Sequence, residues 1–387
     1  MSDGTRFIHT SDWQIGMTRH FLDADAQARF NDARLEAIRA IGRVAAEESC
    51  DFVVVAGDVF DSNFLHRRTV YATLEAISEC EVTFYLLPGN HDALDPSSIY
   101  QTPEFGERKP DNVVVLDEPG LVEVSPGVQV IAAPLLTRKP LTDLLADAIA
   151  KAGIEGGGKS GIRIGVAHGQ LDSLVPDEAN PALISLASAE QNVRDGLLDY
   201  VALGDRHSTL DAGETGRIWY SGTPEPTDYV EDDSGNILVV ELDGSKCRVE
   251  KRHTGTWSFI RREFPIDGAD DLRVVDDWLE SFSQKDRKIL KLAFRGTVSI
   301  REEAELGEIL DRASDLFAAV EDWDRESDLA VRPDDDDFSD LGLSGFAKDA
   351  LDRLVAEAST GGTDLDDPSR AARDALGLLY RLARSGT

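Results

Sequence analysis

The sequence has few cysteines and no long apolar run, and no secretory leader is expected from its first residues. Its three cysteines, Cys50, Cys80 and Cys247, are odd in number and lack CxxC spacing, so they are expected to be reduced, buried thiols. No apolar stretch approaches the ~20 residues that a membrane-spanning helix needs. The first residues lack the basic start and the apolar core of a signal peptide. These absences predict a cytoplasmic protein without a membrane partner.

Positive charge is also scarce. The chain carries 40 Lys and Arg residues against 73 Asp and Glu residues, a formal net charge of −33. Such an excess keeps a protein soluble and repels nucleic acid at long range. An enzyme of this charge that acts on DNA would need its cations gathered around the active site. A salt-adapted host and a GC-rich genome would both explain the bias, and composition does not separate them.

With 387 residues, the chain is too long for one compact core. Strand-like and helix-like segments alternate in the first half, which predicts an α/β architecture. After about residue 257 the pattern becomes that of a small α+β unit, followed by an acidic stretch. We expect a main domain, a small α+β domain, an acidic linker and a helical C-terminal region at 1–256, 257–322, 323–340 and 341–387.

Buried strands in the first half run directly into polar clusters. Strands are expected at the apolar segments 6–9, 52–56, 82–87, 162–166 and 200–203, and helices at 26–48 and 68–80. In open α/β sheets, ligands and catalytic groups gather beyond the carboxyl ends of the strands. The polar residues at these strand ends are Asp12, Gln14, Asp58, Asp61, Asn90, His91, His168, Asp205 and His207.

These side chains supply carboxylate oxygen, amide oxygen and imidazole nitrogen, with no thiolate. That mixture suits Mn²⁺, Fe²⁺ or Zn²⁺ better than Ca²⁺. Two such ions that share a carboxylate, ~3.5–4 Å apart, can activate a bridging water and stabilise a phosphoryl transition state. A single Gly-Asp is usually a turn and an isolated histidine is usually structural, but five clusters in order favour a site over coincidence.

The same clusters resemble the motifs of the calcineurin-like metallophosphoesterase superfamily. The segments 9–13, 56–61, 167–169, 200–204 and 220–225 are further similar to the SbcD-type DNA repair exonucleases, which pair with an SbcC-type coiled-coil ATPase. The resemblance covers about residues 6–255. It implies a four-layer α/β/β/α sandwich, followed by a small α+β capping domain and a helical C-terminal tail.

The resemblance also implies roles for the clustered residues. It assigns Asp12, Gln14, Asp58 and His207 to the first of two divalent ions, and Asp58, Asn90, His168 and Asp205 to the second. His91 would be the acid that steadies the leaving oxygen without binding metal, and Asp61 would orient it. Mn²⁺ is the expected ion, with Fe²⁺ and Zn²⁺ as alternatives.

Two positions depart from the family pattern, which has histidine at both. Gln14 offers only a neutral amide oxygen, which binds metal weakly, and Asp205 adds negative charge. Together they should favour hard ions such as Mn²⁺ and reduce the Lewis acidity of the bound ions. An inactive relative kept as a scaffold is the alternative, although the remaining histidines, Asp58 and Asn90 favour activity.

Substrate contacts are expected from cations in the loops that leave this edge of the sheet. The candidates are Arg19, His20, His66, Arg67, Arg68 and Arg206. A solvated helix start and a surface pair explain the first five equally well. His9 and Trp13 are expected to be structural rather than functional.

Two amphipathic helices are expected at 346–357 and 368–384. Their apolar stripes would dock onto an SbcC-type ATPase, as the resemblance implies, or pack back on this chain, and a homodimer stays open. The leading hypothesis is a metal-dependent DNA exonuclease or endonuclease. Its alternatives are a phosphomonoesterase or small-nucleotide phosphodiesterase, and a non-catalytic or weakened scaffold subunit of an ATPase complex.

Overall fold

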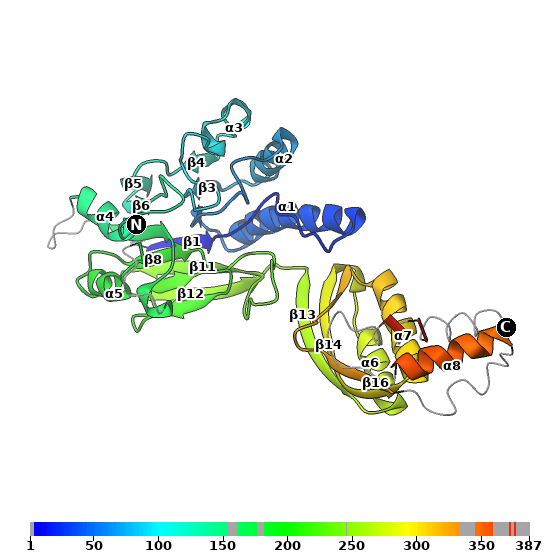
Figure 1. Cartoon of the computed structure of the whole chain (residues 1–387). Coiled ribbons are helices and arrows are strands. Elements are labelled where there is room, and N and C mark those ends of the chain that lie inside the picture. Colours follow the sequence, from blue (N-terminus) through cyan, green and yellow to red (C-terminus); the bar gives the residue numbers. More distant parts are fainter. Residues whose placement is uncertain are drawn as a thin grey trace. The chain divides into compact units, whose positions relative to one another are not determined.

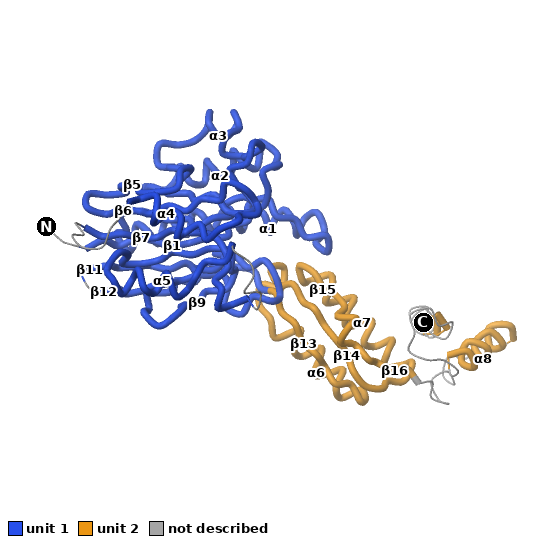
Figure 2. Tube along the Cα trace, turned by 60° about the vertical axis from the view of Figure 1, so that its left-hand side comes forward, with its two compact units in different colours: residues 1–258 blue, residues 259–387 orange. Residues whose placement is uncertain are grey.

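A computed structural model of the protein describes residues 4–153, 161–175, 182–244, 246–332, 345–358, 371–372 and 375–376. The chain forms two compact units, Met1–Ser258 and Phe259–Thr387 (Figure 2).

Two mixed sheets form the centre of the first unit (Figure 1). The first sheet has the order β12-β11-β1-β2-β3-β4, with β1 Gly4–Thr10, β2 Phe52–Val55, β3 Thr83–Leu86, β4 Val113–Val115, β11 Asn236–Asp243 and β12 Lys246–His253. The second has the order β5-β6-β7-β8-β10-β9, with β5 Gly120–Ser125, β6 Val128–Ala133, β7 Ile162–His168, β8 Tyr200–Gly204, β9 Leu210–Ala212 and β10 Ile218–Tyr220. Strands β1 to β4 run parallel, as do β6, β7 and β8.

Strand β2 explains why the expected strands read as continuous apolar runs. Successive side chains of a strand point to opposite faces of the sheet. Phe52 and Val54 face the second sheet and pack into a core with its Ile164 and Val166. Val53 and Val55 pack into a separate core with the helices on the outer face. Both faces of the sheet are therefore covered, as in other parallel sheets.

Helices cover the outer face of each sheet. The first sheet is covered by α1 Ala24–Glu47, α2 Arg67–Ser78 and α3 Pro103–Arg108, and the second by α4 Leu144–Lys151 and α5 Leu186–Arg194. Helix α1 begins after Asp23, whose side chain caps it by accepting the backbone N–H of Ala26 at 2.7 Å. The layers are helix, sheet, sheet and helix, which confirms the predicted α/β/β/α sandwich.

The second unit has its own sheet and its own core. Strands β13 Ser258–Ile266, β14 Lys288–Ser299, β15 Ala319–Asp322 and β16 Asp328–Arg332 pack with helices α6 Ala269–Glu280 and α7 Ile300–Leu316. Helix α7 begins with a capping box between Ser299 and Glu302. Strand β16 pairs with β14 in parallel, so the first part of the predicted linker at 323–340 belongs to this sheet. The acidic remainder of the predicted linker, residues 333–340, lies outside the described part of the chain.

Helix α8, Phe346–Ala358, packs back on its own chain. Its Leu351 shares a core with Ile300 of α7 and with Leu376, and Leu354 packs against this core. Phe346, by contrast, is 87% exposed. Most of the second predicted helix, 368–384, lies outside the described residues.

The cysteines are free thiols, but they are less buried than the sequence suggested. Only Cys80 is buried, while Cys50 and Cys247 are half-buried. No helix in the described ranges combines the length and the apolar character that crossing a bilayer requires.

Candidate metal centre

The polar clusters meet at one edge of the sandwich, where strands of both sheets end. Strands β1, β2 and β3 of the first sheet lead to Asp12, Asp58 and Asn90, and β7 and β8 of the second lead to His168 and Asp205. Neighbouring parallel strands present their carboxyl ends side by side, and the face-to-face packing of the sheets brings the two sets together. Asp205 N–H donates to both carboxylate oxygens of Asp12 at 3.2 Å, which joins the sheets at this edge.

Asp12, Asp58 and His168 form the centre of the cluster. All three are buried, and each offers a ligand atom within 4.8 Å of the others. His168 Nε2 lies 3.5 Å from Asp58 Oδ2 and 2.7 Å from Asn90 Oδ1. It also lies 3.7 Å from Asp205 Oδ1. Five of the seven predicted metal-binding residues therefore lie together, and Asp58, Asn90 and Asp205 all direct an oxygen at His168 Nε2.

His207 and Gln14 complete the set on the other side. His207 Nε2 lies 3.8 Å from Asp12 Oδ1. Gln14 Nε2 donates to Asp58 Oδ2 at 2.9 Å, while Gln14 Oε1 is buried and has no partner among the described residues. All seven predicted metal-binding residues therefore lie together, with Asp58 between the two groups.

Both histidines direct Nε2 at the carboxylates, the nitrogen that a metal ion would bind. His168 Nδ1 lies 2.8 Å from the carbonyl oxygen of Ala56, and His207 Nδ1 lies 2.9 Å from Glu231 Oε1. An N–H at each Nδ1 would donate to these oxygens and leave the Nε2 lone pair facing the carboxylates. Metal-binding histidines in proteins are commonly oriented in this way.

Negative charge dominates the cluster. Burial alone would lower the pKa of His168, but Asp58, Asp12 and Asp205 raise it to about 9. Burial raises the pKa of Asp12, since its carboxylate is removed from water. A cation at this point would relieve both effects. The donor types and this field fit divalent cations, and the unpartnered oxygen of Gln14 is a further free ligand atom.

The backbone at the site is held in an uncommon conformation. Asp12, Gln14, Asp58 and Asp205 all have positive φ, of 54°, 50°, 55° and 93°. Non-glycine residues rarely adopt this region, and such strain concentrates at functional sites. Cross-strand hydrogen bonds hold it in place, from Asp12 N to Gly57 O and from Gln14 N to Asp58 O.

Two glycines let the strands approach each other at this edge. A Cβ on Gly57 would lie 2.1 Å from His168 Nδ1, and one on Gly204 would lie 1.9 Å from the carbonyl oxygen of Ala56. Gly57 also has a φ of +97°, which disfavours any side chain. The Gly-Asp sequence at both strand ends is therefore required by close packing as well as by a turn.

His91 lies at the open side of the cluster. Its backbone N–H donates to Asp58 Oδ1 at 2.9 Å, and its side chain is 42% exposed. Its Nδ1 lies 2.8 Å from the main-chain carbonyl oxygen of Asp61, while the Asp61 carboxylate is 3.8 Å away. The main-chain oxygen of Asp61 is thus the closer partner, and burial raises the pKa of the Asp61 carboxyl.

A pocket of about 460 Å³ lies beside this edge. Asp205 and His207 line it together with Arg19, Arg206 and Tyr220. Arg19 lies 3.8 Å from Asp228, and the Nε atoms of both arginines are buried without a hydrogen-bond partner in the ranges described. His20, His66, Arg67 and Arg68 do not line this pocket, and all four are exposed.

Several supporting residues escaped the sequence analysis. Asp92 accepts the backbone N–H groups of Gly89 and Phe60 and the hydroxyl of Tyr100, and burial raises its pKa to about 6. Its place in the run Gly-Asn-His-Asp was an available signal. Glu231 behind His207 had no signal, because only the fold brings together residues 24 positions apart.

Buried Arg34 of α1 ties two loops at the site together. It donates to the carbonyl oxygens of Trp13 and of Glu225 and Pro226. His9 and Trp13 are fully buried, and His9 lies 3.1 Å from both Tyr200 Oη and Leu203 O. These contacts are structural, as the sequence predicted for His9 and Trp13.

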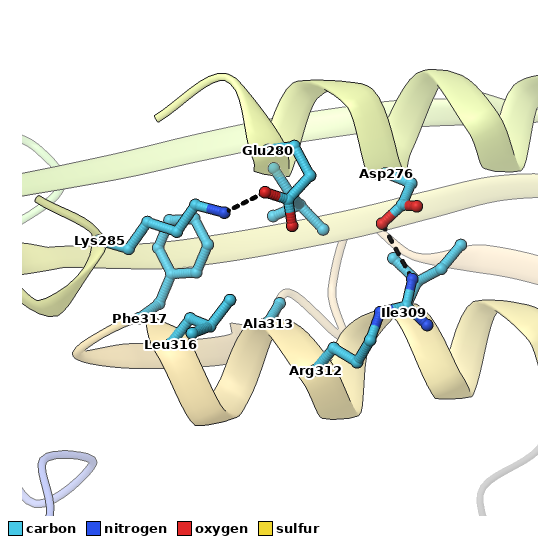
Figure 3. A pocket seen from close by; sticks show the side chains of 9 residues that line it. Asp276, Glu280, Lys285, Ile309, Arg312, Ala313, Leu316 and Phe317 are labelled. Atoms are coloured by element: carbon cyan, nitrogen blue, oxygen red, sulfur yellow. Dashed lines mark hydrogen bonds and ion pairs between the residues drawn. The ribbon is translucent and has the colours of Figure 1, made fainter. Parts of the chain in front are cut away.

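The second unit has a crevice between α6 and α7, closed by ion pairs of Lys285 with Glu280 and of Arg312 with Asp276 (Figure 3). Its volume of about 10 Å³ is close to that of a single water site. It is too small for a substrate.

Comparison with known proteins places the site in context. The sequence model described as calcineurin-like phosphoesterase matches residues 5–209, which contain every residue of the cluster. The chain is 28% identical over 269 residues to the SbcD component of the SbcCD nuclease of Rhodobacter capsulatus, with 57% of this chain and 62% of that protein covered. It therefore spans about three fifths of the length of that relative.

Two further likenesses are more limited. The chain is 30% identical over 97 residues to the uncharacterized metallophosphoesterase YhaO of Bacillus subtilis, with 23% of each chain covered. Among solved structures, the Thermus thermophilus protein TT1561 matches with a TM-score of 0.41 and 12% identity, covering 65% of this chain and 99% of that one. Assignment of the chain to a family follows from the sequence model.

Proposed function

Since the chain belongs to the calcineurin-like phosphoesterase family, we propose that it is a metal-dependent phosphodiesterase that cleaves DNA. The meeting of Asp12, Asp58 and His168 at one sheet edge, with His91 at its open side, carries the proposal. The 28% identity to a component of the SbcCD nuclease favours DNA as the substrate. The same relative suggests a coiled-coil ATPase of SbcC type as partner.

The proposed ligands are Asp12, Gln14, Asp58 and His207 for one divalent ion, and Asp58, Asn90, His168 and Asp205 for another. Mn²⁺ is the preferred ion, because most of these donors are hard oxygens. Bound ions would supply Lewis acidity and an activated water for attack on phosphorus. The protein's own contribution is to fix the donor atoms before the substrate arrives.

His91 is the proposed acid. With Nδ1 oriented by the Asp61 carbonyl oxygen, its Nε2 is 4.0 Å from Asp58 Oδ2, on a half-exposed side chain that substrate can reach. A proton on Nε2 would pass to the leaving sugar oxygen as the P–O bond breaks. Asp61 would hold the ring in this orientation.

Cations near the edge are the proposed phosphate contacts. Arg67 and Arg68 are exposed in the first turn of α2, which has no acidic residue. Basic residues at a helix N-terminus oppose the helix dipole, so a binding role accounts for their position. Phe64, which lies just before α2, is 74% exposed and could stack on a base. Arg19 and Arg206 could hold a neighbouring phosphate in the pocket.

A nuclease assay with Mn²⁺ on linear duplex and single-stranded DNA tests the proposal. Wild-type protein should cleave at least one of these substrates, and chelation of the metal should stop cleavage. Asp58→Asn should abolish turnover, because Asp58 lies between both groups of donors. Asp32→Asn, at an exposed position of α1, is the matched control and should cleave like wild type.

A small-nucleotide phosphodiesterase or phosphomonoesterase is the second candidate. The pocket of about 460 Å³ favours it, since small-ligand sites commonly measure ~300–1,000 Å³. The net charge of −33 would also hinder a small substrate less than a polyanion. Cleavage of mononucleotides or p-nitrophenyl phosphates without any cleavage of DNA would favour this candidate. Absence of turnover on every substrate would favour a scaffold subunit.

A further inference from the structure

We infer that the two groups of donors bind metal unequally, so that the protein holds one divalent cation tightly and a second one weakly. The strong group contains Asp58, Asn90, His168 and Asp205, and the weak group contains Asp12, Gln14, Asp58 and His207. The inference deepens the proposed metal-dependent function and rests on it.

The strong group is arranged for a cation. Oxygens of Asn90, Asp58 and Asp205 lie 2.7, 3.5 and 3.7 Å from His168 Nε2. Both groups hold two carboxylates, which balance the charge of a divalent ion. They differ in the amide, since Asn90 directs its oxygen at the cluster and Gln14 directs its nitrogen there. His168 is fixed by its contact with the Ala56 carbonyl oxygen, so its Nε2 stays directed at these oxygens. These side chains need to move little before an ion binds.

In the weak group, a hydrogen-bond donor occupies the position of a ligand. Gln14 directs its Nε2–H₂ at Asp58 Oδ2 at 2.9 Å, and an amide nitrogen in this role cannot bind a cation. Asp58 Oδ1 accepts the backbone N–H of His91, a contact that concerns both groups equally because they share Asp58. The Gln14 amide therefore partly neutralises the shared carboxylate, as a metal ion would.

The position of Gln14 is restricted by the residues around it. It is completely buried, and its backbone is held at a φ of 50° by the hydrogen bond from its N–H to the Asp58 carbonyl oxygen. The next residue, Ile15, is fixed in the same way to Val59. The smallest change open to the buried side chain is a rotation of its amide, which would exchange its oxygen and nitrogen.

Binding of the second ion through Gln14 requires this rotation, which breaks the hydrogen bond between Gln14 and Asp58. The rotation would bring Oε1, now without a partner, to the side of Asp58 Oδ2, and two oxygens at such a distance attract only with a cation between them. The ion must therefore replace a hydrogen bond to a buried carboxylate. Such a bond weakens binding of the competing ion by roughly 10- to 100-fold. A histidine at this position would bring no such competing donor to Asp58 in its metal-binding tautomer.

Counting Mn²⁺ ions tests the inference on the full-length chain. Protein freed of metal with a chelator is titrated with Mn²⁺, and bound ions are measured by equilibrium dialysis with metal analysis. Wild type should bind one ion per chain first, and a second at roughly 10- to 100-fold higher free Mn²⁺. Two ions of equal affinity, or no first ion, would overturn the inference.

Substitution at Gln14 provides the second measurement. Gln14→His should bind two ions of similar affinity, and its electron paramagnetic resonance spectrum should change from that of isolated Mn²⁺ to that of a coupled pair. Gln14→Glu, which removes the amide donor and keeps the chain length, should also tighten the second ion and serves if the histidine variant does not fold. Gln101→His, at an exposed position, is the control and should behave like wild type.

A folded Gln14→His protein that still binds one tight and one weak ion would refute the role of Gln14. The outcome is separable from the proposed function. Unequal Mn²⁺ binding without cleavage of DNA would leave this inference standing and refute the nuclease. Cleavage of DNA by a protein that binds two Mn²⁺ ions with equal affinity would support the nuclease and refute this inference.

Discussion

Replacing Gly57 with alanine should damage the metal centre through a single methyl group. The added Cβ would lie 2.1 Å from His168 Nδ1 and 2.4 Å from its Cγ, far inside van der Waals contact. His168 is buried in the sandwich, with its two nitrogens held by the Ala56 carbonyl oxygen and by Asn90. The ring must therefore leave this position, or the strand end that carries Gly57 must shift.

The magnitude follows from two local costs. A side chain at a φ of +97° costs about 1–2 kcal/mol. Loss of the buried hydrogen bond between His168 and Ala56 costs about 1–3 kcal/mol. The free energy of unfolding should therefore fall by roughly 2–5 kcal/mol. Displacing the ring should also weaken Mn²⁺ binding by at least about tenfold.

Gly106→Ala is the matched control. Gly106 lies in α3, and a Cβ there would meet nothing within 4 Å. Alanine should leave metal binding unchanged and change stability by at most about 1 kcal/mol, towards greater stability. Urea denaturation and Mn²⁺ titration measure both quantities for each variant. A Gly57→Ala protein with wild-type stability and Mn²⁺ affinity would refute the close approach between β2 and His168.

Three further results are expected. The Glu231 carboxylate orients His207 and raises the pKa of that histidine, whereas burial lowers it. Glu231→Gln removes this carboxylate, so affinity for the more weakly bound ion should fall about 10- to 100-fold. The exposed control Glu214→Gln should leave Mn²⁺ binding unchanged, and equal Mn²⁺ titration curves for the two variants would contradict the role of Glu231. Burial lowers the pKa of His9 from 6.5 to about 3, so the unfolded chain takes up a proton there as the pH falls below 6.5 while the folded protein does not. The stability advantage of wild type over His9→Gln should therefore shrink by about 1.4 kcal/mol per pH unit between pH 6.5 and 3, and a constant difference in denaturant unfolding would rule this out. The excess negative charges of the chain, −33 in net, repel one another and destabilise the folded state. The melting temperature should therefore rise with KCl between about 0.1 and 1 M, because the Debye length falls from ~10 to ~3 Å. A melting temperature that does not rise would argue against this repulsion.

The acidic composition need not conflict with a polyanionic substrate. Arg19 and Arg206 line the pocket beside the cluster, and Arg67 and Arg68 are exposed in the first turn of α2. Metal ions would add positive charge at the cluster. Local charge of this kind can guide a phosphate to the site although the net charge of the protein is negative.

The sequence was sufficient to predict the parts of this protein that depend on local order. Buried strands are visible as short apolar runs, and each one led to the residues that now meet at the edge of the sandwich. Donor chemistry is likewise a property of residue type, so Asp12, Asp58 and His168 could be named in advance. The departure at Gln14 was also visible, but not the direction in which its amide points.

Contacts between distant segments were decided only by the tertiary structure. Glu231 meets His207, Arg34 joins two loops, and β16 completes a sheet within a stretch expected to be a linker. Helix α8 buries Leu351 against Ile300 of its own chain, a choice that its apolar stripe left open. Periodicity records which face of an element is apolar, but the partner of that face depends on how the whole chain packs. For the same reason, the sequence named the candidate metal ligands, and only the packing of two sheets brought them to one point.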